Sequence, residues 1–218
     1  MNPRRILLAA AILAGTTYVA SWFLPLPAAA SVTWKGAGVA LLAVYAATMA
    51  RGLDGWLLAA VLAFGALGDV LLETHGLVTG ALAFLAGHVT AIVLYLRNRR
   101  PAAAGDWAVA LALFVGVPVI AYLLPPQREG AGLIALYAAG LSAMAAAAWL
   151  SRFPRTLVGA GAIMFAVSDL LIFLRTGRPA LDTFPLGLAV WGLYFAGQAL
   201  IAIGATRALG RDAAGRTS

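Results

Sequence analysis

The chain has 218 residues, of which 63% are hydrophobic and only 11% are charged, with a mean hydropathy of +0.93 and a formal net charge of +7. A soluble domain of this length does not need so much apolar surface, so the composition excludes an ordinary soluble protein and indicates a polytopic membrane protein. The sequence contains no cysteine, which excludes disulfides, thiol nucleophiles and thiolate metal sites.

Apolar runs of about 20 residues, each long enough to cross about 30 Å of hydrocarbon, recur along the whole chain. They predict eight transmembrane helices over residues 6–24, 35–51, 56–74, 78–97, 107–124, 130–150, 156–174 and 184–206. Because the links are short, we expect one all-α bundle over residues 1–209, followed by a short, polar, disordered cytoplasmic tail over 210–218. The first run also fits a secretory signal, but it is long and seven more follow, so an uncleaved span is simpler.

The basic residues are placed at the ends of the predicted spans and do not form one amphipathic face, which argues against a nucleic-acid partner. If the N-terminus is cytoplasmic, eleven of the fifteen basic residues lie on the inner side, and four lie outside: Lys35, Arg128, Arg175 and Arg178. This asymmetry follows the positive-inside rule. We therefore expect both termini in the cytoplasm and the protein in a bacterial inner membrane.

Two stretches about a hundred residues apart share one pattern. Ala66-Leu67-Gly68-Asp69 leads to Ala86-Gly87-His88, and Ala166-Val167-Ser168-Asp169 leads to Ala196-Gly197-Gln198. They fall on spans 3–4 and 7–8, which cross the membrane in the same direction and so predict a parallel internal repeat. Spans 1–2 and 5–6 show no convincing match. A carboxylate in hydrocarbon costs about 2.5 to 3.5 kcal/mol on insertion scales, so the paired aspartates predict a shared polar site.

At 1.5 Å per residue, the two aspartates lie about 6 to 8 Å beyond the centres of their spans, toward the outer side. Glu73 shares a helix face with Asp69, and Tyr194 shares one with Trp191 and Gln198. His88 and Tyr194 fall near the midplane. These faces predict a pocket that opens toward the outer leaflet.

Structural roles are the alternative for each of these residues. Either aspartate could be a neutral side chain bonded to a neighbouring helix, Glu73 could reach the interface, and His88, Tyr194 and Gln198 could serve packing. The motif glycines Gly65, Gly68, Gly87 and Gly197 are expected to be close helix contacts rather than catalytic groups. The sequence lacks the second aspartate motif that an intramembrane aspartyl protease needs. It also has only two histidines, His75 and His88, which excludes a zinc hydrolase that uses three. A metal held by His88, Asp69, Glu73 and Asp169 is a minor possibility, and we expect no metal site.

Four segments together resemble the YhhN family of membrane proteins, which includes the lysoplasmalogenases. They are Gly68-Asp69-Val70-Leu71-Leu72, Phe84-Leu85-Ala86-Gly87-His88, Ser168-Asp169-Leu170-Leu171 and Tyr194-Phe195-Ala196-Gly197-Gln198-Ala199-Leu200-Ile201. The resemblance implies hydrolysis of the vinyl ether bond of lysoplasmalogen, which releases a fatty aldehyde and a glycerophospho head group. The implied partners are a lysophospholipid substrate and the bilayer.

That chemistry needs an acid and a base but no cofactor, because the vinyl ether is protonated at its β-carbon and water captures the resulting oxocarbenium ion. We assign Asp69 and Asp169 as the pair without deciding which is the acid. His88, Tyr194 and Gln198 would orient water or substrate, Glu73 would tune Asp69, and Arg175 would bind the lipid phosphate. The main alternative is a proton-coupled transporter that uses the same carboxylates, and a non-catalytic lipid-binding protein is a weaker one.

Overall fold

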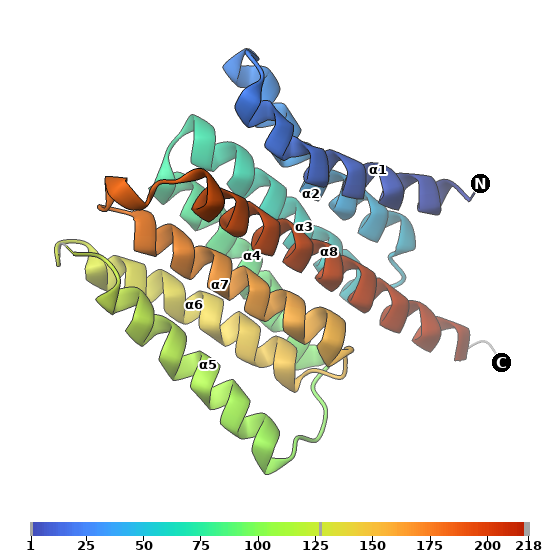
Figure 1. The fold of residues 1–218 in the computed structure, drawn as a ribbon. Helices are drawn as coiled ribbons and strands as arrows, with labels where there is room; N and C mark the ends of the chain where they lie inside the picture. Colours follow the sequence, from blue (N-terminus) through green and yellow to red (C-terminus); the bar gives the residue numbers. More distant parts are fainter. Residues whose placement is uncertain (1, 127, 216–218) are drawn as a thin grey trace. The chain divides into compact units, whose positions relative to one another are not determined.

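The computed structural model describes residues 2–126 and 128–215, and over these residues the chain is all-helical, with no β-strand (Figure 1). Within this described part of the chain, eight helices are long and apolar enough to cross a membrane, which confirms the predicted fold class. The elements in chain order are α1 (Pro3–Thr17), η1 (Tyr18–Phe23), α2 (Ala28–Met49), α3 (Leu53–Thr74), α4 (Leu77–Arg97), α5 (Ala104–Leu123), α6 (Ala131–Leu150), η2 (Arg155–Gly159), α7 (Ala160–Arg175), η3 (Pro179–Leu181) and α8 (Phe184–Gly215).

When η1 is counted with α1 and η2 with α7, two boundaries differ from the expected spans by more than four residues. Helix α2 begins at Ala28, seven residues before the predicted start at 35, because Pro27 precedes a run of three alanines with high helix propensity. Lys35, which was expected as the first residue of its span, is therefore the eighth residue of α2. Helix α8 continues to Gly215, since Arg207, Ala208 and Leu209 are good helix formers, so much of the expected disordered tail is helical. Residues 216–218 of that tail lie outside the described residues, and the cytoplasmic location of the tail stays a prediction.

The short links between helices depend on glycines with a positive φ. Gly52, at φ 76°, joins α2 to α3, and Gly76, at φ 85°, joins α3 to α4. Other residues rarely adopt this backbone conformation, so glycine allows the chain to reverse within a few residues.

The chain divides into two compact units, Met1–Leu94 with Ala202–Ser218, and Tyr95–Ile201. The first unit holds α1 to α4 without the end of α4, together with the last part of α8. The second holds α5 to α7 and the first part of α8. The prediction of a single domain over 1–209 is not tested by this division and stays a prediction.

In the first unit, α2 packs against both α1 and α3 (Figure 1). Helices α3 and α4 approach closely at glycines. A Cβ on Gly68 would lie 2.8 Å from the ring of Phe84, and one on Gly80 would lie 2.8 Å from Cα of Leu72. The glycines thus let α3, which carries Asp69, lie directly against α4.

In the second unit, α5 packs along α6 (Figure 1). Pro118 lies inside α5 and has no N–H to donate to the carbonyl of Phe114, four residues earlier. The hydroxyl of Ser142 on α6 donates a hydrogen bond to that carbonyl over 3.3 Å. A neighbouring helix therefore satisfies the backbone group that the proline leaves open, as hydrocarbon requires.

Helices α7 and α8 cross at a pair of glycines in the same unit. A Cβ on Gly161 would lie 2.6 Å from the carbonyl oxygen of Gly197, and a Cβ on Gly197 would lie 2.6 Å from the carbonyl oxygen of Gly161. The two backbones are therefore in contact at this level. Gly87 on α4, in the first unit, makes a less close helix contact, because its Cβ would lie 3.2 Å from Cβ of Phe64 on α3. The packing role predicted for Gly68, Gly87 and Gly197 is confirmed.

A polar cluster ties together the links at one end of the second unit. Asp106, in the first turn of α5, accepts hydrogen bonds from the backbone N–H of Ala103 at 3.1 Å and from Arg100 at 3.0 Å, and it forms an ion pair with Arg155 at 2.6 Å. Arg152 donates to the side-chain oxygen of Asn98 at 2.8 Å. One carboxylate thus joins the α4–α5 link to the start of η2.

Candidate functional site

Two carboxylates of the first unit, Asp69 and Glu73, lie one turn apart on α3. Asp69 is only 2% exposed, in a helical stretch where the neighbouring side chains are apolar and glycine allows close packing. Glu73 follows four residues later, and its side chain is 44% exposed. The helical spacing predicted from the sequence is present, since both residues belong to the same continuous helix.

Glu73 has a partner that the sequence analysis did not identify. Lys35 Nζ lies 2.5 Å from Oε1 of Glu73, and the lysine side chain is only 10% exposed. The packing of α2 on α3 makes this contact possible, because Gly36 lets the two helices approach until its Cβ position meets Val70 at 2.9 Å. The positive charge of Lys35 therefore opposes the effect that the negative charge of Glu73 would have on the carboxyl group of Asp69.

His88 lies on α4 of the same unit and is 3% exposed. Its burial is consistent with either a structural or a functional role. Gly87 beside it faces Phe64 of α3, so the segment that carries His88 is packed directly on the helix that carries Asp69.

In the second unit, the carboxylate of Asp169 is held by a tyrosine. The hydroxyl of Tyr137 on α6 donates a hydrogen bond of 2.7 Å to Oδ2 of Asp169, which is 7% exposed. The tyrosine ring packs edge-on against Phe173, one turn after the aspartate on α7. Among the described residues Oδ1 has no hydrogen-bond partner. The carboxylate is thus fixed through one oxygen and has the other available as an acceptor.

An aromatic cluster lies where α7 meets α8. Tyr194 packs edge-on against Phe165 at 5.1 Å between ring centroids, and Trp191 stacks on Phe195 at 5.8 Å. Ser168, directly before Asp169, donates a hydrogen bond of 2.9 Å to the carbonyl of Val190. The segment that carries Asp169 is therefore held rigidly against the segment that carries Tyr194.

Gln198 is 2% exposed, and its Oε1 atom has no hydrogen-bond partner among the described residues. A buried carbonyl oxygen without a donor costs about 1 to 3 kcal/mol, so a donor from water or from a bound molecule would be favourable here. This is the property expected of a group that orients water or substrate.

Arg175 is at the end of α7 and forms an ion pair of 3.2 Å with Asp182. The arginine side chain is partly exposed and the aspartate is mostly exposed, so the pair is a weak one. A phosphate that binds Arg175 would therefore compete with the carboxylate of Asp182 for the guanidinium group.

Within residues 2–126 and 128–215, no three His, Asp or Glu side chains gather closely enough to hold a metal ion. Two functional candidates, Lys35 and Tyr137, were missed by sequence reasoning. Lys35 is separated from Glu73 by 38 residues and Tyr137 from Asp169 by 32, and both contacts depend on how two helices pack. For both residues, the only signal in the sequence that could have indicated a functional role was a polar side chain within an apolar helix. The prediction that Asp69 and Asp169 face one cavity stays a prediction.

The sequence profile of the YhhN family matches residues 30–205 of this chain. The chain belongs to the YhhN family. Together with the eight apolar helices, this membership identifies a multi-pass membrane protein. The match covers the aspartates of both repeat segments, as well as Lys35 and Tyr137.

Two curated relatives of this YhhN protein carry the name lysoplasmalogenase, one from Mycobacterium bovis and one from Mycobacterium tuberculosis. Each is 34% identical to this chain over 158 residues, which is 68% of this chain and 59% of the relative. The match thus spans less than two thirds of the length of these relatives. No solved structure matches the chain significantly.

Proposed function

We propose that this protein is a lysoplasmalogenase-like hydrolase, which cleaves the vinyl ether bond of a lysophospholipid to a fatty aldehyde and a glycerophospho head group. Two lysoplasmalogenases among the relatives support this substrate class. The observation that carries the proposal is the carboxylate of Asp169, which is buried in an apolar helix, bonded through Oδ2 to Tyr137 and without a partner at Oδ1. Such a group is suited to accept a proton from water.

The reaction divides into two proton transfers. An acid protonates the β-carbon of the vinyl ether, and the positive charge is shared between the other alkene carbon and the ether oxygen. Water then adds to that carbon and gives its proton to a base, and the hemiacetal breaks down to aldehyde and alcohol. No redox step occurs. During the breakdown of the hemiacetal, the spent acid takes the hydroxyl proton and the protonated base gives its proton to the departing oxygen, so both carboxylates return to their starting protonation states.

We assign the base role to Asp169 and the acid role to Asp69. The tyrosine contact keeps the Asp169 carboxylate in one orientation, which suits a group that must accept a proton in a fixed direction. Asp69 occupies the matching place in the sequence repeat, and its deeper burial suits an acid that donates to carbon. Gln198 and Tyr194 would orient the water or the ether oxygen, and His88 would support Asp69.

The role of Glu73 changes from the sequence expectation. Because Glu73 is paired with Lys35, we propose that the pair as a whole positions the end of α3. The lysine, which is mostly buried, is also a candidate to bind the substrate phosphate when Glu73 turns toward solvent, in addition to Arg175.

The positive-inside asymmetry supports an inner bacterial membrane with both termini in the cytoplasm, and it would put the carboxylates nearer the outer leaflet. The single acyl chain would enter between helices from the bilayer.

The test is mass spectrometry of purified protein incubated with lysoplasmalogen and with its saturated ether analogue. The wild type should release aldehyde only from the vinyl ether, and in D₂O the aldehyde should carry one deuterium at the carbon next to the carbonyl. Asp69→Asn and Asp169→Asn should each lower the rate by about 10² to 10⁴-fold, since the amide keeps the shape but cannot exchange the proton.

Added azide separates the two roles. It captures an oxocarbenium ion without a base and gives an azido ether, so it should restore consumption of the vinyl ether by Asp169→Asn but not by Asp69→Asn. Full activity in both variants would refute the assignment of the pair. Absence of aldehyde from the wild type with both ethanolamine and choline head groups would favour the transporter instead.

A further inference from the structure

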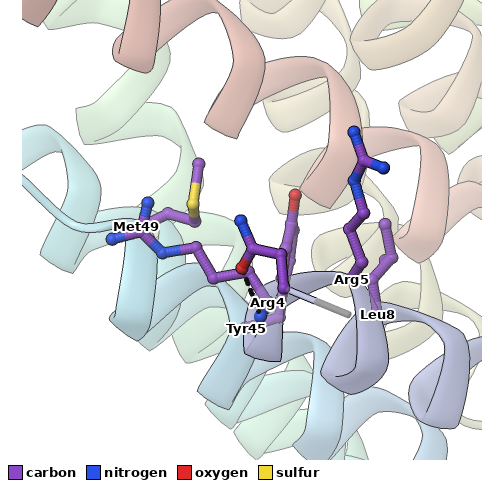
Figure 2. Close-up of a pocket in the computed structure, with 6 residues that line it drawn as sticks. Arg4, Arg5, Leu8, Tyr45 and Met49 are labelled. Carbon is purple, nitrogen blue, oxygen red and sulfur yellow. Dashed lines mark hydrogen bonds between the residues drawn. The ribbon is translucent and has the colours of Figure 1, made fainter.

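A cavity in the first unit lies beside the start of α1, in a region that the proposed hydrolase chemistry does not use. Its volume is about 210 Å³. It is lined by Asn2, Arg4, Arg5, Leu8, Tyr45 and Met49. Figure 2 shows the two arginine side chains extending to different sides of this cavity, with the tyrosine between them.

The cationic groups at this cavity are not neutralised by the protein. Among the described residues, neither Arg4 nor Arg5 forms an ion pair with a carboxylate. The side-chain oxygen of Asn2 is already used, because it accepts a 3.0 Å hydrogen bond from the backbone N–H of Arg4 (Figure 2). The cavity therefore has two guanidinium groups with free donors and no anion of its own.

Tyr45 distinguishes this cavity from a pair of surface arginines. The residue is 8% exposed, and its hydroxyl has no hydrogen-bond partner among the described residues, although it lines the cavity. The hydroxyl is not among the fully buried polar atoms that lack a partner, so it is accessible from the cavity, where its O–H has no partner from the described part of the protein. A ligand oxygen in the cavity would supply that partner.

The other walls are apolar. Leu8 and Met49 line the cavity, and α1 exposes the large apolar side chains Ile6, at 48%, and Leu13, at 64%. A ligand that suits this combination has an anionic oxygen group and a hydrocarbon part. Arginine forks bind phosphate in a bidentate manner, and hydrocarbon chains can lie on the exposed helix surface.

We infer that this cavity binds the phosphodiester of an anionic phospholipid, which is distinct from the lysophospholipid substrate. The phosphate oxygens accept hydrogen bonds from Arg4, Arg5 and the Tyr45 hydroxyl, while the acyl chains run along α1. The inference does not depend on the hydrolase proposal, since it uses none of the residues placed in that reaction. Cations near a membrane surface attract anionic lipids in general, but the tyrosine adds a requirement for an acceptor oxygen at one position.

The experiment is native mass spectrometry of the purified full chain in a non-ionic detergent, titrated with phosphatidylglycerol, with phosphatidylcholine or with inorganic phosphate. The wild type should bind phosphatidylglycerol in preference to phosphatidylcholine. Arg4→Gln with Arg5→Gln should weaken phosphatidylglycerol binding about tenfold or more, and Tyr45→Phe, which changes no charge, about two- to tenfold.

The matched control is Arg207→Gln with Arg211→Gln, which removes two exposed charges from α8 in the same unit without touching the cavity. It should leave lipid binding within twofold of the wild type, and every variant should keep the thermal unfolding midpoint of the wild type. Equal loss in both arginine pairs would mean a general charge effect and overturn the inference. So would unchanged binding in Tyr45→Phe, or inorganic phosphate that binds as tightly as the lipid.

Discussion

The contact between Gly161 and Gly197 gives a prediction whose sign can be worked from the structure. In Gly161→Ala, the new Cβ would lie 2.6 Å from the carbonyl oxygen of Gly197 and 3.1 Å from Cγ1 of Ile201. The carbonyl is backbone and cannot rotate away. Ordinary contact begins at 3.4 Å, so α7 and α8 must separate by about 0.8 Å at the crossing.

Overpacking of this kind costs about 1 to 3 kcal/mol, and the higher helix propensity of alanine returns at most about 1 kcal/mol. We therefore expect Gly161→Ala to destabilise the protein by about 1 to 2 kcal/mol. The matched control is Gly192→Ala on α8, where a Cβ would meet nothing within 4 Å. With no contact to oppose the propensity gain, this variant should be neutral or more stable than the wild type.

The assay is unfolding in detergent micelles, followed by tryptophan fluorescence against added denaturing detergent, with the free energy compared among the three proteins. The variants are expected to move in opposite directions. If Gly161→Ala were as stable as Gly192→Ala, the two backbones could separate without cost, and the crossing would not be what holds the Asp169 helix against the Tyr194 helix.

Three further predictions use the ion pairs and the topology. Glu73→Gln should destabilise the protein by about 1 to 3 kcal/mol, because it leaves the mostly buried Lys35 charge without its partner, and adding Lys35→Met should recover part of that loss in a double-mutant cycle. Asp106→Asn should cost about 1 to 3 kcal/mol in the same unfolding assay, because two arginines lose their shared carboxylate, whereas the exposed Asp182→Asn should cost less than about 1 kcal/mol. Reporter fusions at the C-terminus and within 97–106 should both report the cytoplasm, and an external C-terminus would contradict the predicted orientation.

The fold could be predicted because hydropathy sets it. Each span must be apolar over about 20 residues, and that requirement is visible in the sequence without any knowledge of packing. The start of α2 was missed because Ser31, Thr33 and Lys35 lower the local hydropathy, while the helix depends on alanine propensity and on Pro27 before it. Helix α8 likewise passes Gly210, where polar composition alone suggested an end.

The carboxylates of the candidate site could be found for the same reason, since a charge in hydrocarbon is conspicuous in a sequence. Their partners could not. Lys35 is an ordinary interfacial residue if the helix starts at 35, and Tyr137 is one aromatic residue among many in an apolar run. Each gains significance only when two helices pack at a particular rotation and depth, which periodicity does not determine.

The two partners also bear on the predicted repeat. Lys35 is the eighth residue of α2 and Tyr137 the seventh of α6, so each lies at nearly the same depth in the second helix of its half. Each reaches a carboxylate on the following helix: Glu73 on α3 in the first unit, Asp169 on α7 in the second. The sequence shows no match between these second helices, and the residue at this level is a lysine in one and a tyrosine in the other. A duplicated protein with identical halves would present two equivalent aspartates, whereas a reaction that needs an acid and a base requires unequal ones. The difference between lysine and tyrosine at this position is the kind of change that makes them unequal, since the lysine pairs with Glu73, four residues after Asp69, whereas the tyrosine donates directly to Asp169.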